Sequence, residues 1–365
     1  MKLHVFNPEH DIALASNLAN FTAPHAGRQL RADLGFLPAL WAGGDDAVLV
    51  DCVEVARRRY GRLRGRVGGG EVQFVDKHDL PTLQPDSIEP WGWDAALCAA
   101  LRRWGIADAL LPTAEQLTHI RNLSHRRTSA QLLPLLQMEG IVGEAFECRS
   151  ADEVGELMKR YGRVVLKAPW SSSGRGLRYV DAAHFTHNIE RWLHNLLVQQ
   201  GSVMVEPYYN KVKDFAMEFT ALPDGTIRYE GLSLFHTVNG AYVGNVLASE
   251  SIKREMISRY IPADLLDAVR EKISSSLLLQ NYQGPFGIDM MICAKTQSQE
   301  PLSHSQEPMA NTSYLLHPCV EINLRRTMGH VALAVSPSHD DQQRVMRIEL
   351  TDHYRLCLRK ITCKG

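Results

Sequence analysis

A lysine ends an apolar segment of this chain, and a small glycine-bearing loop follows it closely. Lys167 comes directly after Val-Val-Leu at 164–166, and the loop consists of Ser171, Ser172, Ser173, Gly174, Arg175 and Gly176. A lysine on a rigid strand can hold its charge against phosphate oxygens, and glycines let backbone N–H groups approach them closely. The order excludes a P-loop, in which the lysine follows the glycines. We therefore expect a phosphate site, with a plain turn as the alternative.

Two later apolar segments, 286–292 and 318–325, carry polar residues at single positions. These residues are Asp289 in the first segment and Glu321, Asn323 and Arg325 in the second. With a side-chain period of two, the three polar residues of the second segment share one face of a strand. If the two strands pair, Asp289 joins Glu321 and Asn323 in an oxygen-rich cluster of the kind Mg²⁺ requires. The alternative is a solvated face on which Arg325 forms a salt bridge with Glu321.

Taken in order, these motifs resemble the ATP-grasp superfamily. The match includes the lysine and its loop, the segment 203–209, Asp214 and the two acidic strands, and it begins at about Pro112. The resemblance implies an α/β protein with α+β lobes, in which a Rossmann-like pre-ATP-grasp domain precedes the ATP-grasp fold. It also implies ATP and one or two Mg²⁺ ions as cofactors, with Mn²⁺ as a substitute.

The resemblance assigns roles to single residues. The ATP-binding residues would be Lys167, the loop Ser171 to Gly176, Arg126, Glu206, Pro207, Tyr208 and Asp214. The metal ligands would be Asp289, Glu321 and Asn323. Among the ATP-binding residues, 206–208 would hold the adenine edge and Asp214 the ribose hydroxyls. The helix that opens the nucleotide domain usually supplies a lysine to phosphate, and here we choose Arg126 for that role over Arg121 and Arg127.

The activity that the resemblance implies is a carboxylate–amine ligase. A substrate carboxylate would attack the γ-phosphorus of ATP, and an amine or similar nucleophile would displace phosphate from the acylphosphate. Lys167 would neutralise charge on the transferred group, and Arg325 would orient the carboxylate, because its planar fork suits oxyanions. Two alternatives stay open: a small-molecule kinase of the same superfamily, and an ATP-binding protein without turnover.

Substrate contacts are expected from two further segments. Glu9, His10 and Asp11 follow the first strand, and α/β proteins bind ligands at the carboxyl edge of the sheet. The alternative for this segment is a capped turn with Asp11 at a helix start. His236 and Asn245 belong to a glycine-bearing segment after a later strand, which we expect to be an acceptor loop. The Trp-Gly-Trp-Asp run at 91–94 is either a substrate wall or, as we favour, a domain junction.

Composition favours a cytoplasmic enzyme that acts on small molecules. The 365 residues are 45% hydrophobic and 22% charged, with a formal net charge of −1, which gives no general affinity for polyanions. The arginine-rich run 57–66 is therefore expected to be a solvated helix end rather than a nucleic-acid contact. No apolar run could span a bilayer, and seven scattered cysteines predict neither disulfides nor a zinc site. The sequence leaves both a monomer and a homodimer open.

Apolar periodicity divides the chain into three expected domains. Residues 1–112 contain short buried strands near residues 2, 47 and 72 and form the Rossmann-like domain, although they lack GxGxxG. Residues 113–200 form the lobe with the phosphate loop and include a helix over 124–133 that stops at Pro134. Residues 201–365 form the lobe with the metal site and include a helix over 264–280. The polar segment 295–313 is expected to be an insertion between two paired strands.

Overall fold

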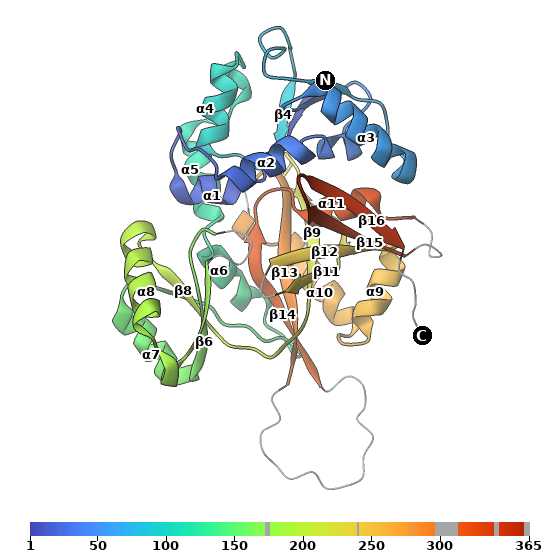
Figure 1. Cartoon of the computed structure of the whole chain (residues 1–365). Helices are drawn as coiled ribbons and strands as arrows, with labels where there is room; N and C mark the ends of the chain where they lie inside the picture. The colour runs from blue at the N-terminus through green and yellow to red at the C-terminus, as the bar shows by residue number, and fades with distance from the viewer. Residues whose placement is uncertain (172–175, 239–240, 280, 296–312, 339–342, 361–365) are drawn as a thin grey trace.

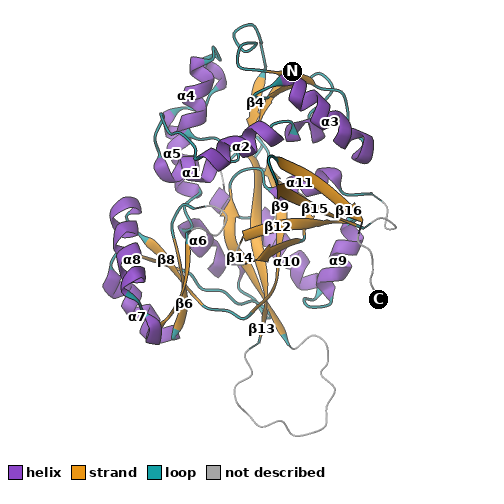
Figure 2. Ribbon diagram, in the orientation of Figure 1, coloured by secondary structure: helices purple, strands orange, loops and turns teal. Residues whose placement is uncertain are grey.

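The residues that the structure describes form four sheets of four strands each. Figure 1 shows the path of the chain from the N-terminus to the C-terminus. The computed structural model describes residues 1–171, 176–238, 241–279, 281–295, 313–338 and 343–360. Helices flank each group of strands (Figure 2). No helix in these ranges is long and apolar enough to cross a membrane. The cysteines that they contain are all free, as the scattered spacing predicts.

The N-terminal sheet is parallel and has the strand order β3-β2-β1-β4. Its strands are β1 (Lys2–Val5), β2 (Ala47–Leu49), β3 (Gln73–Val75) and β4 (Ser87–Pro90). The main helices between and after them are α1 (His10–Ser16), α2 (His25–Leu34), α3 (Val53–Val67) and α4 (Ala95–Arg103). Parallel strands joined through helices are the arrangement predicted for this segment. Because β1 is flanked by β2 and β4, the chain changes direction across the sheet between β1 and β4.

The second sheet has the order β5-β8-β6-β7 and carries Lys167. Its strands are β5 (Phe146–Cys148), β6 (Arg163–Lys167), β7 (Leu177–Asp181) and β8 (Val203–Pro207), and its helices are α7 (Ala151–Tyr161) and α8 (His187–Gln200). The apolar stripes of α7 and α8 pack on the strands through Val154, Met158, Leu193 and Leu196. Both helices end at a glycine with positive φ, which fixes where the following strands begin.

The central sheet is antiparallel and has the order β10-β9-β13-β14. Its strands are β9 (Lys211–Ala221), β10 (Ile227–Ser233), β13 (Gly284–Ala294) and β14 (Tyr314–Asn323). The helices that accompany it are α5 (Ala114–Leu123), α6 (Arg127–Leu136), α9 (Glu250–Ser258) and α10 (Ala263–Ser274). The predicted strands 286–292 and 318–325 therefore do pair, with Ala294 opposite Tyr314 at their far end. Residues 296–312, expected to be an insertion, lie outside the described residues.

Two predicted helix ends are wrong. Pro134 lies inside α6, which continues to Leu136, because the buried side chains of Leu133 and Leu136 hold the last turn in the core. A proline near the end of a helix removes only one backbone hydrogen bond, which packing can outweigh. The helix expected to reach residue 280 ends at Ser274, where Ser275 donates its hydroxyl to the Glu271 carbonyl.

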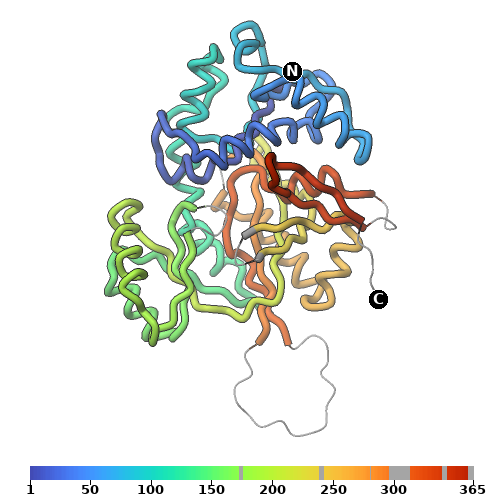
Figure 3. Tube along the Cα trace, in the orientation of Figure 1, coloured from blue at the N-terminus to red at the C-terminus, as the bar shows by residue number. Residues whose placement is uncertain are grey.

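The fourth sheet joins the C-terminal part of the chain to the N-terminal part. Its order is β11-β12-β15-β16, and α11 packs beside it. The bounds are β11 (Phe235–Val238), β12 (Ala241–Leu247), β15 (Arg344–Leu350), β16 (Tyr354–Lys360) and α11 (Met328–Val335). Val331, Met346 and Leu358 share one apolar cluster with Phe6 and Leu34. The tube in Figure 3 shows these red C-terminal strands beside the blue N-terminal helices.

Candidate active site

Lys167 forms a buried ion pair at the end of β6. Its Nζ atom lies 2.6 Å from Oε2 of Glu206, and the two side chains are 6% and 9% exposed. Strand pairing sets Lys167 opposite Met204, so Glu206 is its diagonal neighbour on the same face. Burial raises the pKa of Glu206, and the Lys167 ammonium offsets part of that rise. The structure thus brings together two residues that were predicted to contact ATP.

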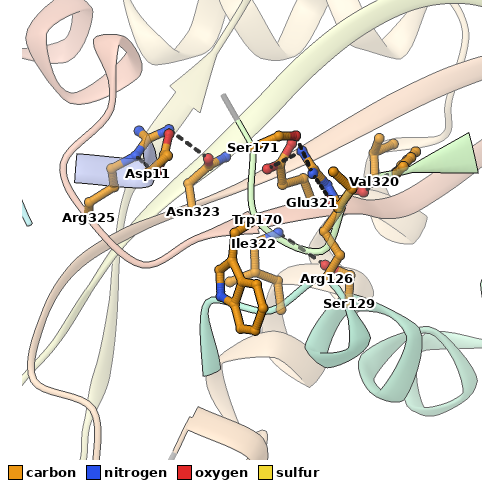
Figure 4. Close-up of polar contacts among 12 residues, drawn as sticks. Asp11, Arg126, Ser129, Trp170, Ser171, Val320, Glu321, Ile322, Asn323 and Arg325 are labelled. Carbon is orange, nitrogen blue, oxygen red and sulfur yellow. Dashed lines mark hydrogen bonds and ion pairs between the residues drawn. The ribbon is translucent and has the colours of Figure 1, made fainter. Parts of the chain in front are cut away.

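Arg126 links three parts of the chain. It precedes α6, and its Nη1 atom donates to the Ala168 carbonyl at 2.5 Å and to Ser171 Oγ at 2.7 Å. Its Nη2 atom donates to Glu321 Oε1 at 2.6 Å (Figure 4). The two alternative arginines point elsewhere: Arg121 stacks on Trp170 at 3.7 Å, and Arg127 lies 3.6 Å from Glu147. Arg126 is therefore the arginine that reaches the acidic strand β14.

The glycine-bearing loop is described only at its ends. The backbone N–H of Ala168 donates to the Gly176 carbonyl at 2.9 Å, which closes the base of the loop. A Cβ atom at Gly176 would overlap the Ser171 side chain, so only glycine fits there. Ser172, Ser173, Gly174 and Arg175 lie outside the described residues, and their role stays a prediction.

One face of the central sheet collects oxygen ligands. Asp289 of β13 lies directly opposite Glu321 of β14, and Gly287 lies opposite Asn323. Directly opposed residues share a face, so the two carboxylates and the amide gather as the alternation predicts. Burial raises the pKa of Asp289 well above its usual value, and the negative charges of Glu321 and Glu218 add to the rise.

This oxygen set suits a hard divalent cation. Crowded carboxylates repel one another, and a cation between them would relieve that repulsion. Within the described ranges, no group of three or more His, Cys, Asp or Glu side chains is arranged to hold a metal ion. A site here would therefore consist of Asp289, Glu321 and the Asn323 amide, with the remaining positions filled by phosphate oxygens or water, as Mg²⁺ commonly has.

Arg325 pairs with the N-terminal domain rather than with Glu321. Its Nε and Nη2 atoms donate to the two Asp11 carboxylate oxygens, each at 2.7 Å, and Nη2 also donates to Asn323 Oδ1 at 3.0 Å. The salt bridge considered as an alternative, Arg325 with Glu321, is not formed, because Glu321 already pairs with Arg126. Figure 4 shows these two groups of polar contacts side by side.

Asp11 lies in the first turn of α1, shortly after β1, at the edge where the N-terminal sheet changes direction. His10 Nδ1 lies 3.3 Å from Asp94 Oδ2 in the loop after β4, and the Asn7 amide donates to the same oxygen at 3.1 Å. Glu9 forms an ion pair with Arg31 at 2.5 Å. A small pocket joins His10 and Asp11 to Ser171, Glu321 and Asn323 across the two domains.

The run at 91–94 is built into this junction. The Trp91 carbonyl accepts a hydrogen bond from the Arg326 backbone at 2.7 Å, and a Cβ atom at Gly92 would lie 2.7 Å from the His10 ring. Asp94 caps α4 by accepting from the Leu97 backbone. These contacts are those of a domain junction.

The residues expected to hold adenosine lie where the chain passes from β8 to β9. Pro207 ends β8, and Tyr208 follows it with its ring 3.9 Å beneath the Arg163 guanidinium. Asp214 of β9 accepts hydrogen bonds from Lys211 and from the Thr237 hydroxyl, both at 2.6 Å.

The acceptor loop expected around His236 and Asn245 is instead a pair of strands, β11 and β12. Asn245 is fully buried, donates to the Ser233 hydroxyl at 2.8 Å and accepts from the Tyr242 hydroxyl. Its amide is thus committed to a buried network. His236 is exposed on β11. The glycine in this segment indicated a loop, but the alternating pattern of a strand was the stronger signal.

Glu218 is a buried acid that the sequence alone did not single out. Its carboxylate accepts from the Thr327 hydroxyl at 2.9 Å and lies 3.0 Å from His330 Nδ1. A Cβ atom at Gly287 would approach it to 2.5 Å, and one at Gly329 would overlap it. The signal was available: Glu218 lies four residues after Asp214, so on a strand it shares the face that carries Asp289.

Comparison with solved structures identifies the fold. The biotin carboxylase domain of the Hydrogenobacter thermophilus 2-oxoglutarate carboxylase matches with a TM-score of 0.50 and 13% identity, over 95% of this chain and 74% of that one. This chain has the ATP-grasp fold. The fold class inferred from the motifs is thereby confirmed.

Two further structures are similar at lower scores. N5-carboxyaminoimidazole synthetase from Staphylococcus aureus has a TM-score of 0.49 and 14% identity, over 96% of this chain and 82% of that one. Biotin carboxylase from Campylobacter jejuni has a TM-score of 0.49 and 12% identity, over 95% and 75%. No protein-family model and no curated protein sequence matches the chain.

Proposed function

We propose that the protein is an ATP- and Mg²⁺-dependent ligase that activates a carboxylate as an acylphosphate and joins it to an amine or similar nucleophile. The observation that carries the proposal is that three cations contact β14: Arg126 donates to Glu321, Arg325 donates to Asn323, and Lys167 donates to the Val320 carbonyl. The fold supports it, and the solved carboxylase domain of the same fold is a complex with MgADP, ADP and bicarbonate.

Two cations beside the glycine-bearing loop would hold the nucleotide. Lys167 and Arg126 each form an ion pair with an acidic partner, Glu206 and Glu321, which fixes the position of the charged group. Phosphate oxygens would take over part of these contacts, because a multiply charged phosphate is the stronger partner. Residues 171–176 would close over the phosphates and exclude water from the reacting group.

The oxygen face would hold Mg²⁺ through Asp289, Glu321 and Asn323. When bound, the ion would neutralise charge between the β and γ phosphates and so favour attack at the γ-phosphorus. Burial and then the charges of neighbouring acids raise the pKa of Asp289, which supports this assignment because a nearby cation would stabilise the carboxylate.

The acceptor would enter the pocket between the domains. Arg325 donates through three of its contacts to Asp11 and Asn323, so its fork already binds a carboxylate in a planar, bidentate manner. A substrate carboxylate would bind the same guanidinium beside Glu321 and Asn323, close to the transferred phosphoryl group. Asp11 and His10 would contact the substrate from the N-terminal side, and Glu9 would support them through Arg31.

Hydroxylamine trapping tests the reaction type. Small carboxylic acids and amino acids are screened with MgATP and hydroxylamine, which converts any acylphosphate to a hydroxamate even when the natural amine is unknown. We expect ADP release to depend on the carboxylate and to be accompanied by equal hydroxamate. Arg325→Lys should suppress hydroxamate more than it weakens ATP binding, because lysine lacks the bidentate fork. A stable phosphorylated product without hydroxamate would identify a kinase instead.

A further inference from the structure

His317 of β14 is a buried histidine whose two ring nitrogens have no hydrogen-bond partner in the part of the chain that the structure describes. Its side chain has no solvent exposure. Neither Nδ1 nor Nε2 has a partner among the described residues. Buried polar groups in folded proteins are nearly always hydrogen-bonded, so an imidazole with two unused nitrogens indicates a partner that comes from outside the chain.

Two residues, Gly143 and Tyr209, pack closely against the His317 imidazole. Gly143, with φ of +139°, lies over it so closely that a Cβ atom there would be 2.9 Å from Nε2. Backbone hydrogen bonds from Val142 to Leu316 and from Leu316 to Gly140 fix this cover to β14. The ring of Tyr209 meets the imidazole edge-to-face, with centroids 5.4 Å apart. Gly143 and Tyr209 therefore fix the position of the His317 imidazole from two sides.

The imidazole lies in the part of the site where a nucleotide base would bind. His317 is directly opposite Met291 of β13, and Met291 is directly opposite Asp214 of β9, so the three side chains form one row on the face that carries Asp289. Asp214 is the expected ribose contact. Tyr209, which packs on His317, follows the expected adenine-edge residues 206–208. A base attached at the ribose would extend over Met291 toward His317.

The charge state of the imidazole suits a neutral base. Burial lowers the pKa of His317 to about 3, and the Lys167 ammonium contributes to the shift. At neutral pH the ring therefore has one N–H donor and one nitrogen acceptor. The purine edge that carries N7 and the six-position group offers an acceptor at N7 and, in adenine, a donor at the six-position amine.

We propose that His317 forms a hydrogen bond with this edge of the purine base and so determines which nucleotide the enzyme prefers. The proposal rests on the proposed function, because it assumes that ATP binds between the lobes. It adds a specificity-determining residue that lies on the central sheet and packs against Tyr209. Glycine is then required at position 143, because a side chain there would displace the His317 imidazole from the position in which it meets the base.

Nucleotide analogues test the proposal. Calorimetry in the presence of Mg²⁺ measures the affinity of the wild-type protein for ATP, for 7-deaza-ATP, which lacks N7, and for purine riboside triphosphate, which lacks the six-position amine. We expect at least one analogue to bind about tenfold more weakly than ATP, the effect of one lost hydrogen bond. If both analogues bind within about twofold of ATP, the proposal is overturned without any variant.

The variant His317→Leu then assigns the contact to this residue. It should bind ATP about tenfold more weakly and should no longer distinguish ATP from the weaker analogue. Tripolyphosphate, which has no base, should bind wild type and variant equally. An unchanged preference in the variant would refute the assignment. His317→Phe, a ring without a donor or an acceptor, replaces it with the same expected and refuting outcomes if the leucine variant does not fold. Absence of any ATP binding would instead remove the proposed function itself.

Discussion

Replacing Lys167 with methionine should destabilise the protein as well as abolish ATP binding. Lys167 and Glu206 lie 2.6 Å apart, with side chains 6% and 9% exposed, so the methionine would leave a buried carboxylate without its cation. Breaking a buried pair by removing one partner costs about 3–5 kcal/mol. For a single cooperative transition of 365 residues, that corresponds to a fall in Tm of roughly 4–6 °C.

The loss should depend on pH in a defined direction. Burial already holds the pKa of Glu206 above its usual value, despite the nearby Lys167. The folded protein therefore binds more protons than the unfolded chain between the unfolded and folded pKa values, and stability falls as the pH rises through that window. Without the lysine the folded pKa rises further. The cost of Lys167→Met should thus be small near pH 5 and largest near pH 8.

Thermal and urea unfolding of three variants measure this effect. The double variant Lys167→Met with Glu206→Gln should recover most of the lost stability, because no charge stays buried, yet it should still fail to bind ATP. Lys159→Met is the matched control: its ion pair with Glu156 is exposed, and such pairs contribute at most about 1 kcal/mol. A Lys167→Met protein as stable as the control at pH 8 would refute the buried-pair argument.

Three further substitutions test other parts of the site. Asp289→Asn should abolish Mg²⁺-dependent turnover. Thermal unfolding of the metal-free variant at pH 8 should show a stability equal to or above that of wild type, because a buried charge close to other acids is removed. A large fall in Tm would instead make Asp289 a structural residue. Arg325→Lys should weaken the contact between the domains at Asp11, and limited proteolysis should cleave the variant faster than wild type. Gly329→Ala should cost about 3 kcal/mol or more in urea unfolding, because its methyl group would overlap the buried Glu218 carboxylate. Gly155→Ala, on an open helix surface, should instead stabilise by about 0.5–1 kcal/mol, and equal effects of the two would contradict the packing.

The oxygen face could be predicted because its information is local. Within each strand, the alternation of side chains decides which residues share a face. Asp289, Glu321 and Asn323 therefore come together once the two strands pair in the correct register. β13 and β14 pair in that register. The buried lysine at the end of β6 was predictable for the same reason. The three-domain division at residues 112 and 200 remains a prediction.

The partner of Arg325 could not be predicted from the sequence. Asp11 is 314 residues away, and its contact depends on how the N-terminal domain packs against the central sheet. That packing involves α11 and the last two strands, which share an apolar cluster with residues of the first sheet. The residue pattern within one segment cannot predict such a long-range contact. The sequence therefore suggested a local salt bridge between Arg325 and Glu321, which the structure does not form.

The misplaced features have a common physical cause. Proline and glycine are the strongest local signals for an end or a loop, yet their cost is about 1–3 kcal/mol, which burial of one or two large apolar side chains can offset. Leu133 and Leu136 carry α6 through Pro134 in this way, and Val246 and Leu247 hold β12 as a strand beside Gly244. At Gly143 and Gly329 the same residue type has the opposite meaning. There the missing side chain makes room for a buried imidazole and a buried carboxylate, so a glycine near this site is evidence about what lies against it.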